Sequence, residues 1–448
     1  MMVRAGLRGA SALGLLLIAT AAANAGGFAL REQSAYGQGT SYAGVAAGGD
    51  LSSMYWNPAL MTQFAGVQSS ATYSGIFPYA ANTPAAGSTL GALGGTTNTI
   101  NNAFLPSSYM SYQLNPRLWL GMSFNAPFGL STRFPDLWAG RDYSGNTTLK
   151  TYNAAPSIAF KINDWISVGA GVQIEYASAD LSRGVTVPVP RVGLLPVDSA
   201  DIWGTGWGYG FTAGLTLTPT PTTTIGLGYR SQLNQKIDGT LQQYGAIPLP
   251  GTTNGSVSTT IDLPDIVSLG IRQQVSPQWT FMGTVEWTNW SRIGTSEVDS
   301  GSGGPALVGG KPVTIAFNYD DGWFFALGAE YKWTDRLTVR GGVAYEISPI
   351  TDDVRIPLLP DNDRTWVSVG ATWLIARGVS MDLAYSHAFV KSTSIDVSAA
   401  SGNPSYDGVT TYLGDVSSHF DIISLGLKIR WDEFLHPQAP AKTALYTK

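Results

Sequence analysis

The sequence predicts an all-β protein: a transmembrane antiparallel β-barrel of fourteen strands with an N-terminal hatch that plugs it. Three observations carry this prediction: an export signal, a period-two alternation of apolar and small residues, and a regular exchange of short turns with long connections. Only 13% of the 448 residues are charged, about half of the ~25% typical of soluble domains. That composition argues against an ordinary cytosolic enzyme.

The export signal occupies residues 1–25. Arg4 and Arg8 precede an apolar run over residues 10–23, and Ala23-Asn24-Ala25 is the small-x-small pattern that a signal peptidase cuts. We therefore expect cleavage after Ala25. No later stretch reaches the ~18 apolar residues of a spanning helix, so a mature protein in a membrane must form a closed barrel.

Period-two alternation is the dominant pattern from about residue 67 onward. Phe325 and Leu327, for example, alternate with Ala326 and Gly328. Successive side chains of a strand point to opposite faces, so each strand presents one apolar face and one face of small residues. The face of small residues carries few charges, which argues against a soluble sandwich with its surface in water.

Short turns and longer connections divide these strands. Six tight turns each join two alternating segments: Asn115-Pro116-Arg117, Asn163-Asp164, Pro219-Thr220-Pro221, Ser276-Pro277-Gln278, Thr334-Asp335-Arg336 and Ala376-Arg377-Gly378. Seven longer connections lie near residues 77–104, 128–149, 179–204, 240–260, 294–316, 348–363 and 391–416. Thirteen connections join fourteen strands, and this layout is typical of a bacterial outer-membrane barrel.

Tryptophan residues gather at one end of the predicted strands. Five of them lie close to a tight turn or to the end of the last strand: Trp165, Trp279, Trp333, Trp373 and Trp431. Tryptophan is enriched where a barrel meets the membrane–water interface, so these residues indicate an aromatic girdle.

The segment before the barrel, residues 26–66, does not alternate. Asp50 indicates the start of a helix, and Asn57-Pro58-Ala59 interrupts it. The segment is too short to bury a core of its own, and a barrel of fourteen strands is too wide for side chains alone to fill. We therefore expect residues 26–66 to form the hatch, residues 67–431 the barrel, and residues 432–448 a periplasmic tail.

Several classes of function are disfavoured by what the chain contains. It has no cysteine and three scattered histidines, which leaves little material for a metal site, and we expect no metal and no cofactor. A net charge of −5 without a basic cluster argues against binding nucleic acid. Ser386 and His387 point to opposite faces of a strand, so they cannot pair as nucleophile and base, and we expect no enzyme.

Several short motifs resemble the FadL family of outer-membrane transporters of long-chain fatty acids and hydrocarbons. They are Gly27-Phe28 after the cleavage site, Asn57-Pro58-Ala59-Leu60 in the hatch, and Pro360-Asp361-Asn362-Asp363-Arg364 followed by Trp366. The resemblance implies passive, ligand-gated uptake of a hydrophobic small molecule across the outer membrane of a Gram-negative bacterium. We expect a monomer whose only other partner is outer-membrane lipid.

The resemblance also implies roles for particular residues. A kink in the third strand, through which substrate leaves sideways, matches Gly129, and Pro127 beside it cannot donate to a strand ladder. Phe28 matches an aromatic residue at the ligand pocket, and Arg183 matches a basic residue that faces the ligand carboxylate. Asn57, Pro58 and Ala59 fall in the part of the hatch that gates the path.

One departure keeps the nature of the ligand open. A second basic residue expected near the tenth strand falls instead at Asp320 or Asp321, which would place negative charge where a carboxylate binds. Long-chain fatty acids and neutral aromatic or alkane hydrocarbons are therefore both compatible with the sequence. A water-filled porin for polar solutes is disfavoured by the apolar hatch.

Overall fold

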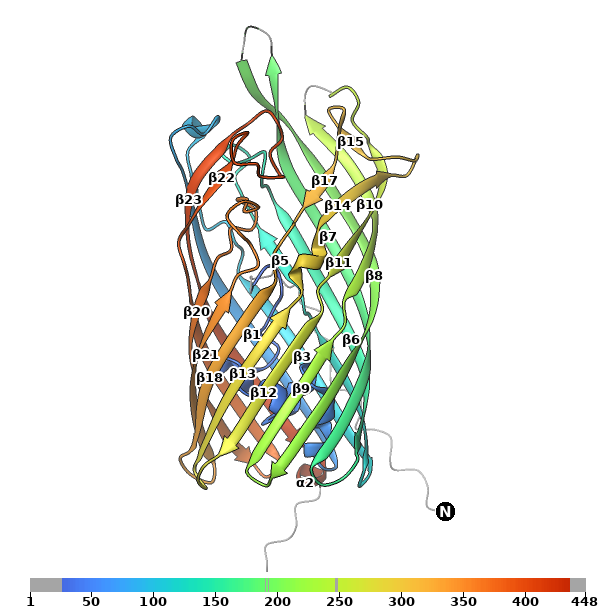
Figure 1. The fold of residues 1–448 in the computed structure, drawn as a ribbon, viewed down its shortest axis with the longest axis vertical. Helices are drawn as coiled ribbons and strands as arrows, with labels where there is room; N and C mark the ends of the chain where they lie inside the picture. Colours follow the sequence, from blue (N-terminus) through green and yellow to red (C-terminus); the bar gives the residue numbers. More distant parts are fainter. Residues whose placement is uncertain (1–25, 190, 192, 246–248, 436–448) are drawn as a thin grey trace, which may run out of the picture.

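The computed structural model describes residues 26–189, 191, 193–245 and 249–435. The predicted export signal lies outside these residues, as do residues 436–448 of the predicted tail. Fourteen crossings form one closed antiparallel barrel, and the long axis of the barrel is vertical in Figure 1.

The crossings run in chain order around the barrel, and several are divided into two strands. They are β1 (Val67–Pro84), β3 (Ala103–Asn115), β4 (Leu118–Asn125) with β5 (Gly129–Thr132), β6 (Thr147–Lys161), β7 (Ile166–Val189), β8 (Gly193–Thr220), β9 (Thr223–Arg230) with β10 (Leu233–Gly245), β11 (Gly255–Leu263) with β12 (Ile266–Gln274), β13 (Trp279–Thr288) with β14 (Thr295–Ser300), β17 (Thr314–Ala316) with β18 (Gly322–Lys332), β19 (Leu337–Ile347), β20 (Arg364–Ala376), β21 (Val379–Val390) with β22 (Thr393–Val397), and β23 (Tyr412–Arg430). β1 pairs with β23 from Gln68↔Arg430 to Pro84↔Gly414, which closes the barrel.

Shorter elements lie in the connections: β2 (Thr96–Thr97), η4 (Gly91–Leu93), β15 (Leu307–Val308) and β16 (Lys311–Pro312). η5 (Trp290–Ile293) lies between β13 and β14, and α2 (Trp431–Leu435) follows β23. Among the described residues, no helix is long and apolar enough to cross a membrane. All six predicted tight turns are confirmed, and they share one end of the barrel, called the turn end below. The opposite end is called the loop end.

One predicted connection is wrong, because the structure has a paired hairpin where a loop was expected. Residues 179–204 were expected to form a loop, but β7 and β8 continue as a paired hairpin up to Val189↔Gly193 and project beyond the loop end (Figure 1). Val185, Thr186 and Val187 are β-branched and favour the extended backbone of a strand. These residues continue the alternation of the membrane strand. Both faces of the hairpin are of mixed polarity, however, so a pattern based on apolar faces does not indicate a strand there.

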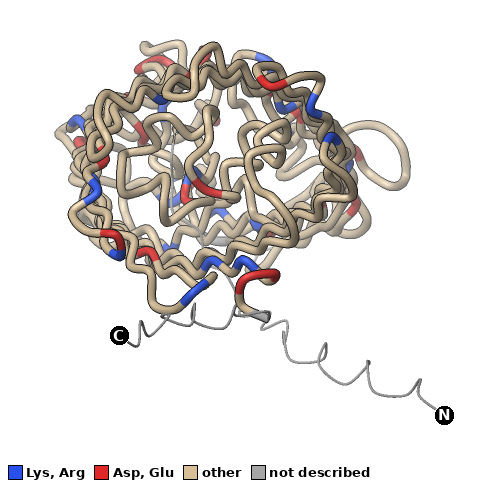
Figure 2. The backbone as a smooth tube through the Cα atoms, turned by 90° about the horizontal axis from the view of Figure 1, so that it is seen from below, with Lys and Arg blue, Asp and Glu red and all other residues tan. Residues whose placement is uncertain are grey.

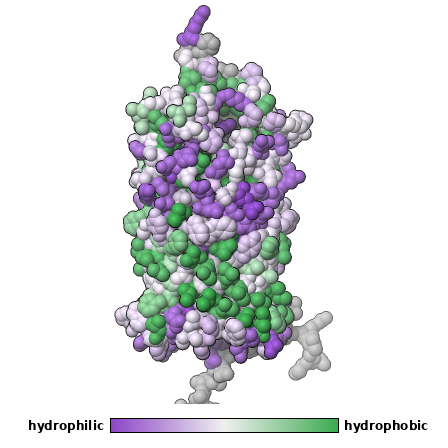
Figure 3. Space-filling model, in the orientation of Figure 1, coloured by the Kyte–Doolittle hydropathy of each residue, from purple (hydrophilic) through white to green (hydrophobic). Residues whose placement is uncertain are grey.

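The two faces of the wall differ as the alternation predicts. Phe325 and Leu327 on β18 are 40% and 69% exposed, whereas Phe324 and Ala326 are 1% and 3% exposed. Figure 3 shows the outward apolar side chains as a green band over the half of the barrel nearer the turn end. The exposed tryptophans near the tight turns lie where the girdle was predicted: Trp165, Trp279, Trp333 and Trp373.

The hatch fills the barrel near the turn end, and in Figure 2 its loops lie inside the ring of strands. It contains α1 (Ala35–Gln38), η1 (Val45–Ala47), η2 (Leu51–Tyr55) and η3 (Pro58–Gln63). A Cβ atom added to Gly226, Gly228 or Gly342 would lie 1.8–2.1 Å from a backbone oxygen of the hatch. The small residues of the inner face therefore make room for the hatch.

Candidate functional site

The barrel wall is interrupted at its third crossing, between β4 and β5. β6 pairs with β4 as far as Asn125 and resumes with β5 at Gly129. Residues 126–128 leave the ladder, and Pro127 among them has no N–H to donate. The two residues predicted to mark a kink thus lie at a break in the wall.

The first residues of the hatch lie along this break like a short added strand. The amide of Leu30 donates to the carbonyl oxygen of Pro127 at 2.7 Å, and the amide of Gly129 donates to that of Phe28 at 2.9 Å. Backbone groups that the broken ladder leaves without a wall partner are satisfied by the hatch. Residues 28–30 therefore seal the wall, which the sequence did not predict.

Phe28 occupies the centre of an aromatic cluster directly inside the break. Its side chain is 2% exposed. The ring centroid lies 4.8 Å from that of Trp290, 5.9 Å from that of Phe317 and 6.1 Å from that of Phe128. The contacts with Trp290 and Phe128 are edge-to-face, an arrangement that is favourable at these distances and stabilises the position of the ring.

A cavity of about 440 Å³ lies between this cluster and the loop end. Phe28 and Arg183, both predicted as ligand-binding residues, line it together. Apolar side chains from the wall and the long loops supply much of the remaining surface, among them Leu130, Val185, Ile202, Leu241, Ile315 and Leu359. This mixture of an apolar lining with a few polar groups is typical of small-molecule sites.

Two cations and two anions line the same cavity. The cations are Arg183 and Lys311, and the anions are Asp142 and Asp407. The ammonium group of Lys311 donates to the backbone carbonyl of Asp407 at 2.6 Å. Burial raises the pKa of Asp142 above its ordinary value, and the nearby carboxylate of Asp407 adds to that effect.

Lys311 is a site residue that the sequence reasoning missed. Neither Asp320 nor Asp321 is among the residues that line the cavity. The carboxylate of Asp321 instead accepts from the indole N–H of Trp287 at 2.9 Å and from the amide of Ser291 at 3.2 Å. A lone lysine in a loop of glycine and apolar residues is the signal that could have indicated Lys311.

The predicted gating motif joins the hatch to the wall. The Asn57 side chain accepts from the amide of Ala59 at 3.0 Å and so caps η3, with Pro58 at its first position. Its amide nitrogen also donates to the carbonyl oxygens of Ala46 at 2.9 Å and Leu215 at 3.0 Å. Since Leu215 belongs to β8, Asn57 fixes the hatch to the barrel.

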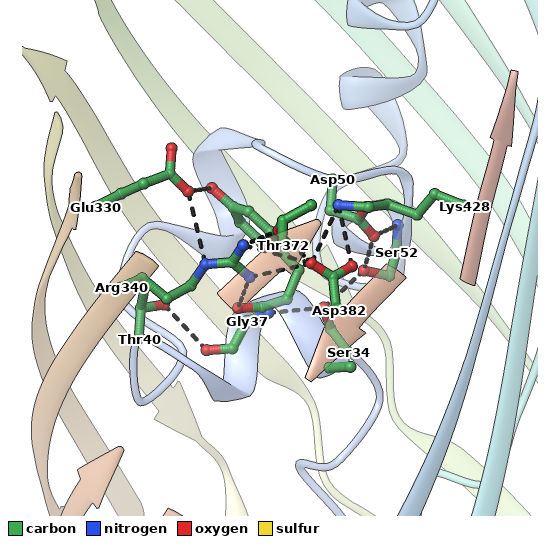
Figure 4. Close-up of polar contacts among 12 residues, drawn as sticks. Ser34, Gly37, Thr40, Asp50, Ser52, Glu330, Arg340, Thr372, Asp382 and Lys428 are labelled. Carbon is green, nitrogen blue, oxygen red and sulfur yellow. Dashed lines mark hydrogen bonds and ion pairs between the residues drawn. The ribbon is translucent and has the colours of Figure 1, made fainter. Parts of the chain in front are cut away.

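A network of ion pairs near the turn end provides a second attachment (Figure 4). Lys428 on β23 lies 3.2 Å from Asp50 of the hatch and 3.0 Å from Asp382 on β21. Arg340 on β19 lies 3.3 Å from Asp382. Burial acts to raise the pKa of Asp50, but Lys428 and hydrogen bonds from Ser52 outweigh it and hold that pKa below its ordinary value.

Tyr36 extends this network on the hatch side. Its hydroxyl donates to Glu330 on β18 at 2.6 Å, and its carbonyl oxygen accepts from Arg340 at 3.3 Å. Burial, assisted by Glu330, raises the pKa of Tyr36 to about 12, so it remains a hydrogen-bond donor at neutral pH. The hatch is therefore bound to the wall on several sides by polar groups.

Comparison with known proteins gives the same picture. The profile of the outer membrane protein transport protein family (OMPP1/FadL/TodX) matches residues 16–430. The long-chain fatty acid transport protein of Escherichia coli is 28% identical over 427 residues, covering 87% of this chain and 93% of that protein. Outer membrane protein P1 of Haemophilus influenzae is 28% identical over 415 residues, covering 83% and 88%.

Two solved structures are similar along nearly their whole length. The crystal structure of a Pseudomonas aeruginosa FadL homologue superposes with a TM-score of 0.79 at 26% identity, covering 90% of this chain and 99% of that one. The Pseudomonas putida toluene transporter TodX superposes with a TM-score of 0.64 at 16% identity, covering 89% and 98%, which shows a shared fold.

Proposed function

The chain belongs to the outer membrane protein transport protein family (OMPP1/FadL/TodX), and from this premise we propose that it takes up hydrophobic small molecules, foremost long-chain fatty acids, across the outer membrane. The relatives named above as fatty acid transport proteins support this choice of cargo. The turn end is then periplasmic and the loop end extracellular. Transport is passive, and no catalysis forms part of the proposal.

One observation carries the proposal: the cavity that contains Arg183 touches, through Phe28, the segment that seals the wall break. A fatty acid would place its carboxylate at the cations Arg183 and Lys311, since an ionised carboxylate in an apolar site requires charged partners. Its acyl chain would then extend along the apolar lining toward Phe28.

Release through the wall break is favoured by the free energy of the acyl chain. Each methylene moved from an apolar site into water costs about 0.8 kcal/mol. For a chain of ten methylenes, exit into the aqueous periplasm would therefore be unfavourable by roughly 8 kcal/mol. Exit sideways into the bilayer avoids that cost. The break at residues 126–128 follows Phe124, whose side chain is 54% exposed on the outer face of the wall, and this position supports the route.

Gating would consist of moving Phe28. An acyl chain that takes the place of the ring would draw residues 28–30 out of the break. The two sealing backbone hydrogen bonds, at 2.7 and 2.9 Å, each contribute only about 0.5–1.5 kcal/mol. The ring contacts of Phe28 add roughly 0.5–1.5 kcal/mol each. Burial of several methylenes of the acyl chain, at about 0.8 kcal/mol each, can offset both losses.

A neutral hydrocarbon is the second candidate cargo. Asp142 and Asp407 lie in the cavity beside the two cations, so the site already contains partners for its own positive charge. A ligand without a charge would leave those contacts undisturbed. The two cargoes differ in their dependence on Arg183.

The test is native mass spectrometry of detergent-purified protein, followed by extraction and identification of the bound molecules. We expect a long-chain fatty acid that is lost in Arg183→Ala and kept in Arg191→Ala, an exposed arginine on the same hairpin. A hydrocarbon kept in both variants would change the cargo. An empty barrel that conducts ions in a planar bilayer would contradict the proposal in favour of a porin.

A further inference from the structure

The backbone nitrogen of Gly26 lies against a buried carboxylate. It donates to Glu346 on β19 at 3.0 Å, and Glu346 is 4% exposed. The next nitrogen, that of Gly27, donates to the carboxylate of Asp361 at 3.1 Å. The first two described nitrogens of the chain are thus both held by acidic side chains inside the barrel.

Position 26 is shaped for this contact. A Cβ atom added to Gly26 would lie 2.8 Å from the same oxygen of Glu346, closer than real Cβ contacts come. Any larger residue would therefore push the carboxylate away from the nitrogen. A space of about 30 Å³ beside Gly26, Arg31, Glu286 and Glu346 is large enough for an ordered water.

Glu346 shares its cation with another carboxylate. Among the described residues its one ion pair is with Arg31, at 3.5 Å, and Arg31 lies closer to Glu286, at 2.6 Å. The nearby guanidinium of Arg364 is in an ion pair with Asp361. The indole N–H of Trp366 also donates to Glu346, at 3.0 Å, but that donor is neutral. A carboxylate buried with only part of a positive charge is costly, so the site has room in its charge balance for one more cation.

Export supplies such a cation. Cleavage after Ala25, which the sequence predicts, would convert the nitrogen of Gly26 from an amide with one hydrogen into an α-amino group. An α-amino group is cationic below pH ~7.7–8.0 and has three hydrogens to donate. In the uncleaved chain the same nitrogen carries no charge.

We propose that Glu346 is the binding site for the α-ammonium group created at Gly26 by signal-peptide cleavage, and that this ion pair latches residues 26–30 into the barrel. Charge-assisted hydrogen bonds are roughly twice as strong as neutral ones, so cleavage strengthens a contact that the chain already makes. Only the processed protein has the complete latch. The ion pair does not depend on what the protein transports, whereas its effect on gating rests on the proposed function.

The latch lies two residues from the cavity. Phe28 lines the ligand cavity, and its carbonyl oxygen accepts from Gly129 at the wall break. Residues 26–28 therefore connect the ion pair, the cavity and the seal in one short stretch of backbone. Freeing the α-amino group would let this stretch leave the break more readily.

The test is the rate at which a water-soluble acetylating reagent modifies the α-amino group at pH 7 in intact detergent-solubilised protein. Trypsin then releases residues 26–31 for mass spectrometry, and modified lysines report the dose of reagent. We expect Glu346→Gln to be modified about tenfold faster than wild type, because an ion pair that raises the amine pKa by one unit lowers the reactive fraction tenfold.

Two further variants make the result specific. Glu175→Gln changes an equally buried wall glutamate that bonds Asn153 and Gln235, and it should leave the rate at the wild-type value. Insertion of one alanine after Ala25 keeps every side chain but moves the amine by ~3.5 Å, and it should react as fast as Glu346→Gln. This insertion also serves if Glu346→Gln does not fold.

Equal rates in wild type, Glu346→Gln and the insertion variant would overturn the ion pair, as would a mature chain whose intact mass begins at a residue other than Gly26. Labelling requires no ligand, so a failure of the proposed transport function leaves this readout intact. A freed amine with unchanged fatty acid uptake would overturn the effect on gating alone.

Discussion

The amide of Gly129 donates a 2.9 Å hydrogen bond to the carbonyl oxygen of Phe28, which joins the break in the barrel wall to the cavity that Phe28 lines. One residue thus faces the cavity with its ring and the break with its backbone. Because the two groups share a single Cα atom, the proposed gating requires that a ligand which displaces the ring also moves the backbone of the seal. This coupling leads to the following predictions.

Deletion of residues 26–39 should leave the barrel folded, since its ladder is closed by β1 and β23. It removes Phe28 and the seal, so we expect weaker ligand binding and an open path. Heat-dependent migration on a gel checks the fold, and ion conductance in a planar bilayer checks the path. Unchanged ligand binding and uptake would show that this segment has no gating role.

Replacing Pro127 and Gly129 together by valine should restore strand pairing with β6 and close the exit. We expect fatty acid uptake to fall at least tenfold, the effect of about 1.4 kcal/mol. Gly341→Ala is the matched control, because its added methyl would lie 3.6 Å from the nearest atom, in ordinary contact. If the double variant transports at the wild-type rate, the wall opens elsewhere.

Glu32 should make the seating of the hatch depend on pH. Burial, chiefly, raises its pKa from 4.5 to about 7. Burial favours the protonated form of Glu32, so the closed hatch is fully stabilised below pH ~4.5, where this side chain is protonated in every state. That stabilisation, roughly 3 kcal/mol, falls as the pH rises above 4.5 and is lost as it passes through 7. Hydrogen exchange of hatch amides should be slower at pH 5 than at pH 8 relative to intrinsic rates, and Glu32→Gln should abolish the difference. An equal pH dependence in that variant would assign the effect to another group.

Lys428→Met should loosen the hatch at the turn end. It leaves the buried carboxylates of Asp50 and Asp382 without their shared cation, and breaking a buried pair in this way costs about 3–5 kcal/mol. We expect faster proteolysis of the hatch, measured against Lys391→Met, which removes an exposed lysine directly after β21, at the loop end. Equal proteolysis in the two variants would mean that the ion pairs of Lys428 do not hold the hatch in place.

The barrel could be predicted from the sequence because its signals are local. Alternation shows which face of a strand is apolar, and turns such as Asn163-Asp164 mark where a strand reverses. The hairpin of β7 and β8 beyond the membrane was missed because neither of its faces is uniformly apolar. Its strands are held by pairing with each other, which a single strand does not reveal.

The site could be predicted only in part, because its contacts span the chain. Phe28 and Arg183 were identified through a resemblance, and the structure brings both to one cavity. Lys311 was missed because loops carry no periodic pattern. Gly26 and Glu346 are 320 residues apart, and nothing near either residue indicates the other.

A reversible cross-link across the wall break tests the central claim most directly. Ala29 lies opposite Phe128 in an antiparallel bridge of the type without direct hydrogen bonds, in which Cα atoms lie roughly 4.5 Å apart, within reach of a disulfide. The chain has no cysteine, so Ala29→Cys with Phe128→Cys introduces the only thiols. We expect fatty acid uptake by the oxidised pair to be at least tenfold slower than by either single variant and to recover on reduction. Equal uptake by the oxidised and reduced pair would contradict gating by the hatch at this break.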